Sequence, residues 1–150
     1  MVVETAEPKV KAWEEEVAAV AAKHNGLLRA EDVVEFAADP KTALHSKFTW
    51  EDTDAARRWR LLEARNLIAV VVVYMPQIKT EVRAFVSLTS DREKDGGGYR
   101  QLTTVLAHKE RRTELLDDAL ADFDRWKAKY EMLVELAEVF QARSRVRPKS

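Results

Sequence analysis

The sequence of 150 residues contains no cysteine, and glycine and proline are scarce, with four of each. The absence of cysteine excludes a disulfide framework, a zinc site made of thiolates and a cysteine nucleophile. Long hydrophobic runs are also missing, because the longest, LIAVVVVYM at 67–75, is about half the length of a membrane-spanning helix. Its high valine content predicts a buried strand instead.

The chain also lacks an excess of charge of either sign. It has 25 Lys and Arg against 26 Asp and Glu, for a net charge of −1. A balanced chain has no general attraction to nucleic acid or anionic membranes, so such binding would need local clusters of charge. The first residues are acidic where a signal peptide would be basic, which predicts a cytoplasmic protein that does not bind a membrane.

What is present is a globular composition, 46% hydrophobic and 34% charged, which predicts a folded chain. Apolar spacing predicts a first helix over 9–24 that stops at Asn25 and Gly26, and a short acidic helix over 29–40. Three residues of the irregular segment that follows are expected to insert into the core: Leu44, Phe48 and Trp50. A third helix then begins at one of three candidate caps: Thr49, Asp52 or Thr53.

The middle of the chain predicts a β-hairpin. The strand at 67–75 turns at Pro76, and Val82, Ala84, Val86 and Leu88 alternate with Glu81, Arg83, Phe85 and Ser87 as in a half-buried strand. A charged loop follows, and Gly96, Gly97 and Gly98 make it mobile or tightly turned. A short helix is predicted over 101–106.

The stretch from 110 to 143 has neither glycine nor proline and carries apolar residues at alternating spacings of three and four. This pattern predicts one helix of about 34 residues, roughly 50 Å long, which is more than a small domain can cover. Six residues of its stripe are the predicted oligomer interface: Leu116, Phe123, Trp126, Tyr130, Leu133 and Phe140. The alternative is a helical hairpin, broken near 127–131, that folds back on the same chain.

The segment DAARRWRLLEAR, residues 54–65, is the candidate nucleic-acid interface. On a helix, one side gathers Ala55, Ala56, Trp59, Leu62 and Leu67, and the other carries four arginines: Arg57, Arg58, Arg60 and Arg65. The planar guanidinium is well suited to phosphate. Against this, the helix begins EDTD, whose carboxylates repel phosphate, so a solvated basic face is an equally good interpretation.

The order of elements favours DNA binding. Two helices, a turn, an arginine-bearing helix and a hairpin match a winged helix-turn-helix, although unrelated small domains share this order. Other basic residues that could assist lie in the glycine loop and the C-terminal tail: Arg92, Lys94, Arg100, Arg143, Arg145 and Arg147.

Patterns for catalysis are weak. The three histidines lack metal-ligand spacing, and His45 beside Ser46 lacks a nucleophile elbow. The GGG stretch lacks the lysine and hydroxyl of a P-loop, and the acidic runs at 14–16 and 115–124 are typical of solvated helix faces. The sequence predicts no enzyme, no metal and no cofactor.

The stretch LLRAEDVVEFAADPKTALHSKFTWEDTDAARRWRLLEARNLI, with VRAFVSL and GGGYR downstream, resembles a group of small, mostly uncharacterised proteins from tailed phages and prophages. The resemblance covers most of 27–140 and consists of core and capping residues. It implies a phage-encoded protein acting in the host cytoplasm, and supplies no site residues.

Together these observations predict a mostly helical α+β protein, with a winged-helix-like unit at 1–100 and a long helical oligomerisation segment with a basic tail at 101–150. The leading hypothesis is a phage DNA-binding accessory protein in regulation, recombination or packaging, which binds duplex phosphates through the arginine helix. The alternative is a structural or interaction protein whose C-terminal helix binds a host or virion protein. A ring-forming packaging subunit would combine both roles, and a homo-oligomer is expected.

Overall fold

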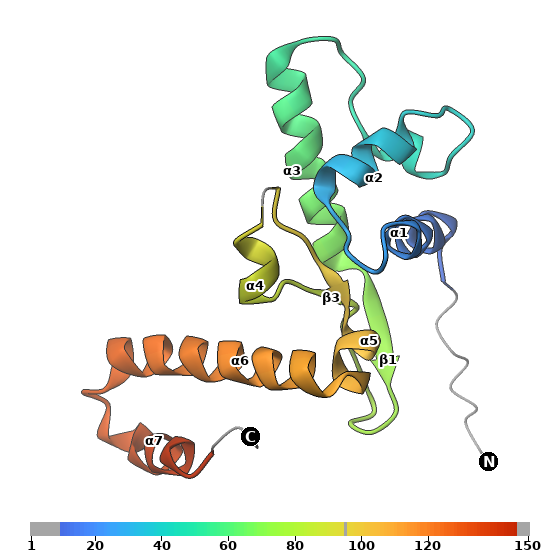
Figure 1. Cartoon of the computed structure of the whole chain (residues 1–150). Helices are drawn as coiled ribbons and strands as arrows, with labels where there is room; N and C mark the ends of the chain where they lie inside the picture. The colour runs from blue at the N-terminus through green and yellow to red at the C-terminus, as the bar shows by residue number, and fades with distance from the viewer. Residues whose placement is uncertain (1–9, 95, 147–150) are drawn as a thin grey trace, which may run out of the picture.

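The computed structural model of the chain describes residues 10–94 and 96–146 and has a mostly helical α+β fold. A body built from the first two thirds carries an arm of two antiparallel helices (Figure 1). Every buried residue of the described ranges lies between Trp13 and Val105. The hydrophobic core is therefore complete before the arm begins.

The body begins with helices α1 (Ala12–Lys23) and α2 (Ala30–Ala37), as predicted. The break between them is a left-handed turn, with φ of 57° at Asn25 and 86° at Gly26. Asparagine and glycine adopt this conformation most readily, so the predicted helix stop is confirmed.

The short 3₁₀ helix η1 (Leu44–Lys47) is held against α1 by one carboxylate. Glu16 accepts hydrogen bonds from the backbone N–H groups of Ala43 and Leu44, both at 2.8 Å. Leu44 and Phe48 are buried, and Trp50 packs partly buried against the same cluster, which confirms the three predicted core insertions.

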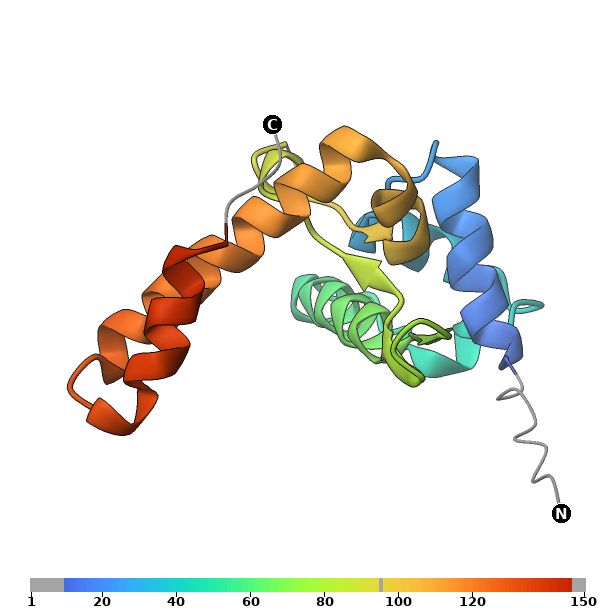
Figure 2. The same cartoon turned by 90° about the horizontal axis from the view of Figure 1, so that it is seen from below.

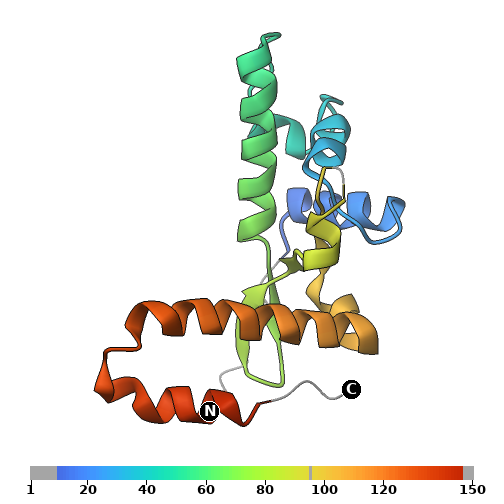
Figure 3. The ribbon, with the colours of Figure 1, turned by 60° about the vertical axis from the view of Figure 1, so that its left-hand side comes forward.

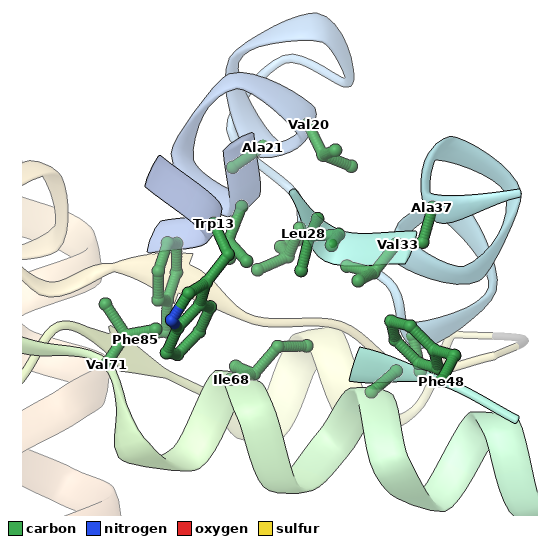
Figure 4. Close-up of a cluster of buried hydrophobic side chains, with 14 residues drawn as sticks. Trp13, Val20, Ala21, Leu28, Val33, Ala37, Phe48, Ile68, Val71 and Phe85 are labelled. Atoms are coloured by element: carbon green, nitrogen blue, oxygen red, sulfur yellow. The ribbon is translucent and has the colours of Figure 1, made fainter. Parts of the chain in front are cut away.

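Helix α3 (Asp54–Val70) is capped by Thr53, whose side chain accepts a hydrogen bond from the backbone N–H of Ala56 at 3.0 Å. The buried strand predicted over 67–75 is present only from Val72, and its residues are exposed or half-buried, because α3 continues through Val70. Ile68 follows Ala64 at helical spacing and both are fully buried, so tertiary packing outweighs the strand preference of the valine run. Figure 4 shows Ile68 pointing from α3 toward the cluster that contains Trp13 of α1 and Val33 of α2.

The predicted hairpin is present as strands β1 (Val72–Met75) and β2 (Thr80–Arg83), paired antiparallel from Val72 opposite Arg83 to Met75 opposite Thr80. The second strand does not continue as predicted. The chain bends at Ala84, and β3 (Phe85–Val86) pairs instead with β4 (Arg100–Gln101). The bend reverses the alternation, so that Phe85, expected on the outer face, is buried.

Two short helices flank the second sheet: α4 (Thr89–Arg92) and α5 (Leu102–Ala107), the latter close to its predicted position. Because β4 pairs with β3 and Val105 of α5 is buried, the body extends past the expected division at 100/101.

The single long helix predicted over 110–143 is wrong, and the hairpin alternative is confirmed. Helix α6 (Lys109–Tyr130) ends in a turn, and η2 (Val134–Leu136) and α7 (Ala137–Ser144) return along it (Figures 2 and 3). The reversal begins at Glu131, at the end of the predicted break. Among the described helices, none is long and apolar enough to span a membrane.

Candidate functional site

The four arginines of α3 lie in different environments. Arg57 forms ion pairs with two acids at the start of its own helix, with Nη2 at 2.9 Å from Asp52 and Nη1 at 3.7 Å from Asp54. Its charge is thereby partly neutralised by the EDTD segment. Exposed pairs of this kind are weak, so Arg57 remains able to exchange partners.

Arg60 is committed to the structure of the preceding loop. Its Nη1 donates to the carbonyl oxygens of Thr49 at 3.0 Å and Glu51 at 2.9 Å. The guanidinium also lies over the ring of Trp50, 5.3 Å from its centroid. These contacts hold the segment before α3 in place, and they leave Arg60 poorly available to a ligand.

Arg58 and Arg65 are exposed, and neither has an ion-pair partner among the described residues. They accompany Trp59 and Leu62, whose side chains are 54% and 43% exposed. The indole N–H of Trp59 donates to Glu63 at 2.8 Å along the same helix. The outer face of α3 is therefore a mixture of two arginines and two large apolar side chains.

Apolar spacing grouped Trp59 and Leu62 with Ala56, opposite the arginines, but the two large side chains are exposed whereas Ala56 is buried. The core side of α3 is formed by Ala56, Ala64 and Ile68, and α2 packs against this helix. Small residues permit close packing of two helices, whereas a tryptophan would separate them. Helix α3 carries apolar residues on two faces, and spacing alone does not distinguish which face is buried.

The base of the glycine loop is closed by a buried ion pair. Asp91 is 1% exposed and receives two hydrogen bonds from Arg100, from Nε at 2.7 Å and Nη2 at 2.9 Å, with Lys94 Nζ at 3.4 Å. Burial by itself raises the pKa of Asp91, but the hydrogen bonds and charges of Arg100 and Lys94 outweigh burial and hold that pKa below its ordinary value. Arg100, a predicted DNA contact, is therefore bonded to Asp91 and not free to bind phosphate.

The glycine loop itself is tightly turned, one of the two predicted possibilities. Gly96 and Gly97 have φ of 80° and 65°. A Cβ on Gly98 would lie 2.4 Å from Cδ1 of Leu27, so a side chain at this position would require Leu27 to shift. Ser87 Oγ donates to the carbonyl oxygen of Gly98 at 2.8 Å, which fixes the loop against β3.

The remaining predicted basic residues are also largely paired within the chain. Arg92 donates to the carbonyl oxygen of Ser87 at 2.6 Å, and Arg143 donates to both oxygens of Asp124 at 3.0 and 2.9 Å. Arg145 is exposed. Arg147 lies outside the described residues. Among the described residues, most of the predicted cations are therefore bonded within the chain.

A joint between α4 and α6, which the sequence analysis missed, attaches the arm to the body. Asp118 accepts hydrogen bonds from the backbone N–H of Thr89 at 2.9 Å and from its hydroxyl at 2.5 Å, and Glu114 accepts from the N–H of Ser90 at 2.8 Å. These carboxylates cap the first turn of α4. The sequence signal for this joint was the acidic run at 115–124, which was interpreted as a solvated face. The backbone N–H groups at the start of a short Thr-Ser-Asp helix need carboxylate acceptors of this kind.

Aromatic residues from the predicted oligomer interface hold α6 and α7 together. The ring of Trp126 lies 5.6 Å from Phe123, 5.3 Å from Tyr130 and 6.0 Å from Phe140 of α7. Such centroid separations are those of favourable tilted aromatic pairs. The pairing is incomplete as a core, because Trp126 and Tyr130 each remain 40% exposed.

The face of α6 that α7 covers continues uncovered toward the start of the helix. There a groove of about 610 Å³ lies along α5 and α6. Its lining is mainly apolar but includes two cations, Lys109 and Arg112. The other lining residues are Leu106, Thr113, Leu115, Leu116 and Ala119. A second, almost wholly apolar hollow lies between α6 and α7 at Leu120, Phe123 and Val139.

The turn between α6 and α7, residues 131–135, exposes three consecutive apolar side chains, and we call it the arm tip. Met132, Leu133 and Val134 are 71%, 42% and 80% exposed. Glu131 and Glu135 flank them and are also exposed. A solvent-facing loop usually carries polar residues, so this apolar tip requires an explanation.

The described residues hold no group of histidines and acids positioned to bind a metal ion. His45 Nδ1 is hydrogen-bonded to the carbonyl oxygen of Ala37 at 2.8 Å, and Ser46 Oγ donates to the carbonyl oxygen of Ala43 at 3.1 Å. These neighbouring side chains therefore bond separately to the backbone. The features available for function are apolar surfaces edged by charge, which suit binding.

Comparisons with known proteins identify no relative of this chain. No family model, curated protein or solved structure matches the chain. Any proposal about function therefore depends on the geometry of the surfaces described above.

Proposed function

We propose that the chain is a non-enzymatic interaction protein that binds another protein through the α6–α7 arm. The observation that carries the proposal is that none of the 22 residues of α6 is buried, although the helix has a continuous apolar face. A helix with this pattern is normally covered along its length. Here α7 covers only its second half.

The total surface of the chain supports an uncovered interface. It exposes 10915 Å², whereas a folded monomer of 17.2 kDa is expected to expose about 7800 Å². Part of this excess belongs to residues outside the described ranges, and an interface of standard size, roughly 800 Å² on each partner, fits within it.

The resemblance to tailed-phage proteins gives this proposal its setting. We infer a phage-encoded protein that acts in the host cytoplasm and binds a host protein, a virion protein or itself. Catalysis forms no part of the proposal, because the surfaces that distinguish this chain are apolar rather than reactive.

The proposal is tested by photo-crosslinking in the producing cell. A photoreactive amino acid replaces Val134 in the arm tip or, as a control, Ile78 at the tip of the β1–β2 hairpin, which is 61% exposed. We expect the Val134 position to give one saturable protein adduct that is lost when Leu116→Asp is added. Equal adducts from both positions, or none from Val134, would contradict an arm-specific function.

A second candidate function, duplex DNA binding in the manner of a winged helix-turn-helix, is favoured by the order of elements in the body. Helices α1, α2 and α3 are followed directly by the β1–β2 hairpin, which would act as the wing. In this proposal Arg58 and Arg65 contact phosphate. It ranks second because Glu51, Asp52 and Asp54 lie exposed at the end of α3 that would approach the groove.

Titration with random duplex DNA at about 50 and 200 mM salt tests this second candidate, since phosphate contacts lose affinity steeply with salt. Arg58→Ala with Arg65→Ala should abolish binding, whereas Arg57→Ala should reduce affinity less, because Asp52 and Asp54 partly neutralise the charge of Arg57. Absence of binding at the lower salt would eliminate the candidate.

A further inference from the structure

We propose that the partner of the arm is a second copy of the same chain, and that the two arms dock reciprocally. The arm tip of each copy, Met132 to Val134, inserts into the groove that lies along α5 and the first half of α6 of the other copy. This inference rests on the proposed function and names its partner.

The first argument is that the chain supplies both halves of the contact. Among the described residues, none occupies the groove of about 610 Å³ with an apolar side chain, and none covers the arm tip, whose side chains are 71%, 42% and 80% exposed. Both features lie on the same helical hairpin, one near the start of α6 and the other just beyond its end. Two arms running antiparallel about a two-fold axis near the middle of α6 bring each tip to the other groove.

The second argument is charge complementarity. Lys109 and Arg112 line the groove, whereas Glu131 and Glu135 flank the arm tip. In the reciprocal arrangement two cations of one copy face two acids of the other, and the two-fold axis repeats this contact. A closed two-fold interface requires such self-complementarity, because each copy presents the same surface.

The chain's own C-terminal residues are a poorer occupant. Helix α7 ends at Ser144, and the sequence that follows reads RVRPKS. This segment has three basic residues and no large apolar residue beyond Val146. Its charge has the same sign as that of Lys109 and Arg112, so it would be repelled from the groove that it would have to fill.

The test uses full-length chains with reversed charges and sedimentation analysis of their mass. Lys109→Glu with Arg112→Glu makes the groove acidic, and Glu131→Lys with Glu135→Lys makes the tip basic. Each variant alone would place like charges together at both contacts. An equimolar mixture would place opposite charges together at both, so we expect two monomers that form a one-to-one dimer when they are mixed.

Loss of apolar contact is tested separately. Met132→Ser with Val134→Ser should raise the dissociation constant of the wild-type dimer by about tenfold or more, equivalent to at least about 1.4 kcal/mol. The matched control, Val72→Ser with Ile78→Ser, removes two exposed apolar side chains from the hairpin and should leave the dimer unchanged. Circular dichroism confirms that every variant remains folded.

Three results would each overturn reciprocal docking. The first is a wild-type chain that stays monomeric at about 100 μM, which is well above a micromolar dissociation constant. The others are a tip variant that dimerises as tightly as the wild type, and an oligomer larger than a dimer. A crosslink from Val134 to a different protein, together with a monomeric wild type, would remove this inference and retain the proposed function. Absence of any adduct from Val134 would remove both.

Discussion

At the scale of single residues, the buried pair of Asp91 and Arg100 has the largest consequence for stability. The carboxylate is almost fully enclosed, and the Arg100 side chain is only 12% exposed. An isolated charge at either position would be costly, because burial removes its hydration. The pair closes the loop that contains Gly96, Gly97 and Gly98, so it fixes β4 next to β3.

Asp91→Asn should lower the free energy of unfolding by about 3 kcal/mol at neutral pH, because it leaves Arg100 buried without its counter-ion. The pKa of Asp91 is depressed in the folded state, so the stabilisation is present above the ordinary carboxyl pKa of about 3.8 and is lost as pH falls through the folded value. Denaturant titrations across this range should therefore show the two proteins converging in acid.

Asp117→Asn is the matched control, since Asp117 is an exposed acid on α6 with no hydrogen bond or ion pair among the described residues. It should leave stability nearly unchanged. A loss for Asp91→Asn that is equal at every pH would show that the carboxylate charge is not responsible.

At the scale of elements, the joint between α4 and α6 couples body to arm. Helix α4 has only four residues, too few to form without help, and its first N–H groups are satisfied by side chains of α6. The carboxylates of Asp118 and Glu114 therefore order α4 and orient α6 through the same hydrogen bonds.

Asp118→Ala should reduce stability by about 1–2 kcal/mol, the usual effect of losing a helix cap. It should also accelerate hydrogen exchange at the Thr89 amide, which donates to Asp118. Exchange measured by NMR checks both parts, with Asp117→Ala as the control on the adjacent residue. Unchanged exchange at Thr89 in the Asp118 variant would contradict the capping role.

At the scale of the whole molecule, the protein divides into a body with a core and an arm without one. Among the described residues, burial ends at Val105, and hydrogen bonds between α4 and α6 help to attach the arm. This arrangement makes the body the unit that folds and the arm a projecting surface, as Figures 1 and 2 show.

A chain ending at Ala107 should therefore fold cooperatively, with a loss of about 1–3 kcal/mol from the missing α4 caps. Thermal unfolding followed by near-ultraviolet circular dichroism of Trp13 and Trp50 provides the measurement. A further cut that removes α5, ending at Gln101, should prevent cooperative folding because it deletes the buried Val105. If the chain ending at Ala107 unfolded without a cooperative transition, α6 would be shown to contribute to the core.

Sequence periodicity predicted the helices of the body well, because their stops and caps are local. Asn25 with Gly26 and the Thr53 cap act within a few residues of their own positions. The start of the strand at residue 67, the unbroken strand through Ala84 and the single C-terminal helix were predicted wrongly for the opposite reason. Each depends on contacts distant in sequence: the packing of Ile68, the pairing of Phe85 with Gln101, and the return of Phe140 to Trp126.

The candidate sites were harder to predict than the fold. Sequence spacing located the arginines of α3, but it could not show that Arg60 bonds to the carbonyl oxygens of Thr49 and Glu51. It also grouped Trp59 with the buried Ala56, since apolar spacing is equally good on two faces of the helix. The importance of Trp126 and Phe140 was visible from the sequence, but their pairing within one chain was only one of two alternatives.

The early closure of the core at Val105 has a consequence for how this protein can change. Substitutions in the body must preserve a marginal folding equilibrium, whereas substitutions along α6 and α7, apart from Glu114 and Asp118, displace almost no buried atoms. Recognition can therefore diversify without approaching the threshold below which the chain unfolds. A designer could exchange the arm for one of different specificity and retain the same scaffold.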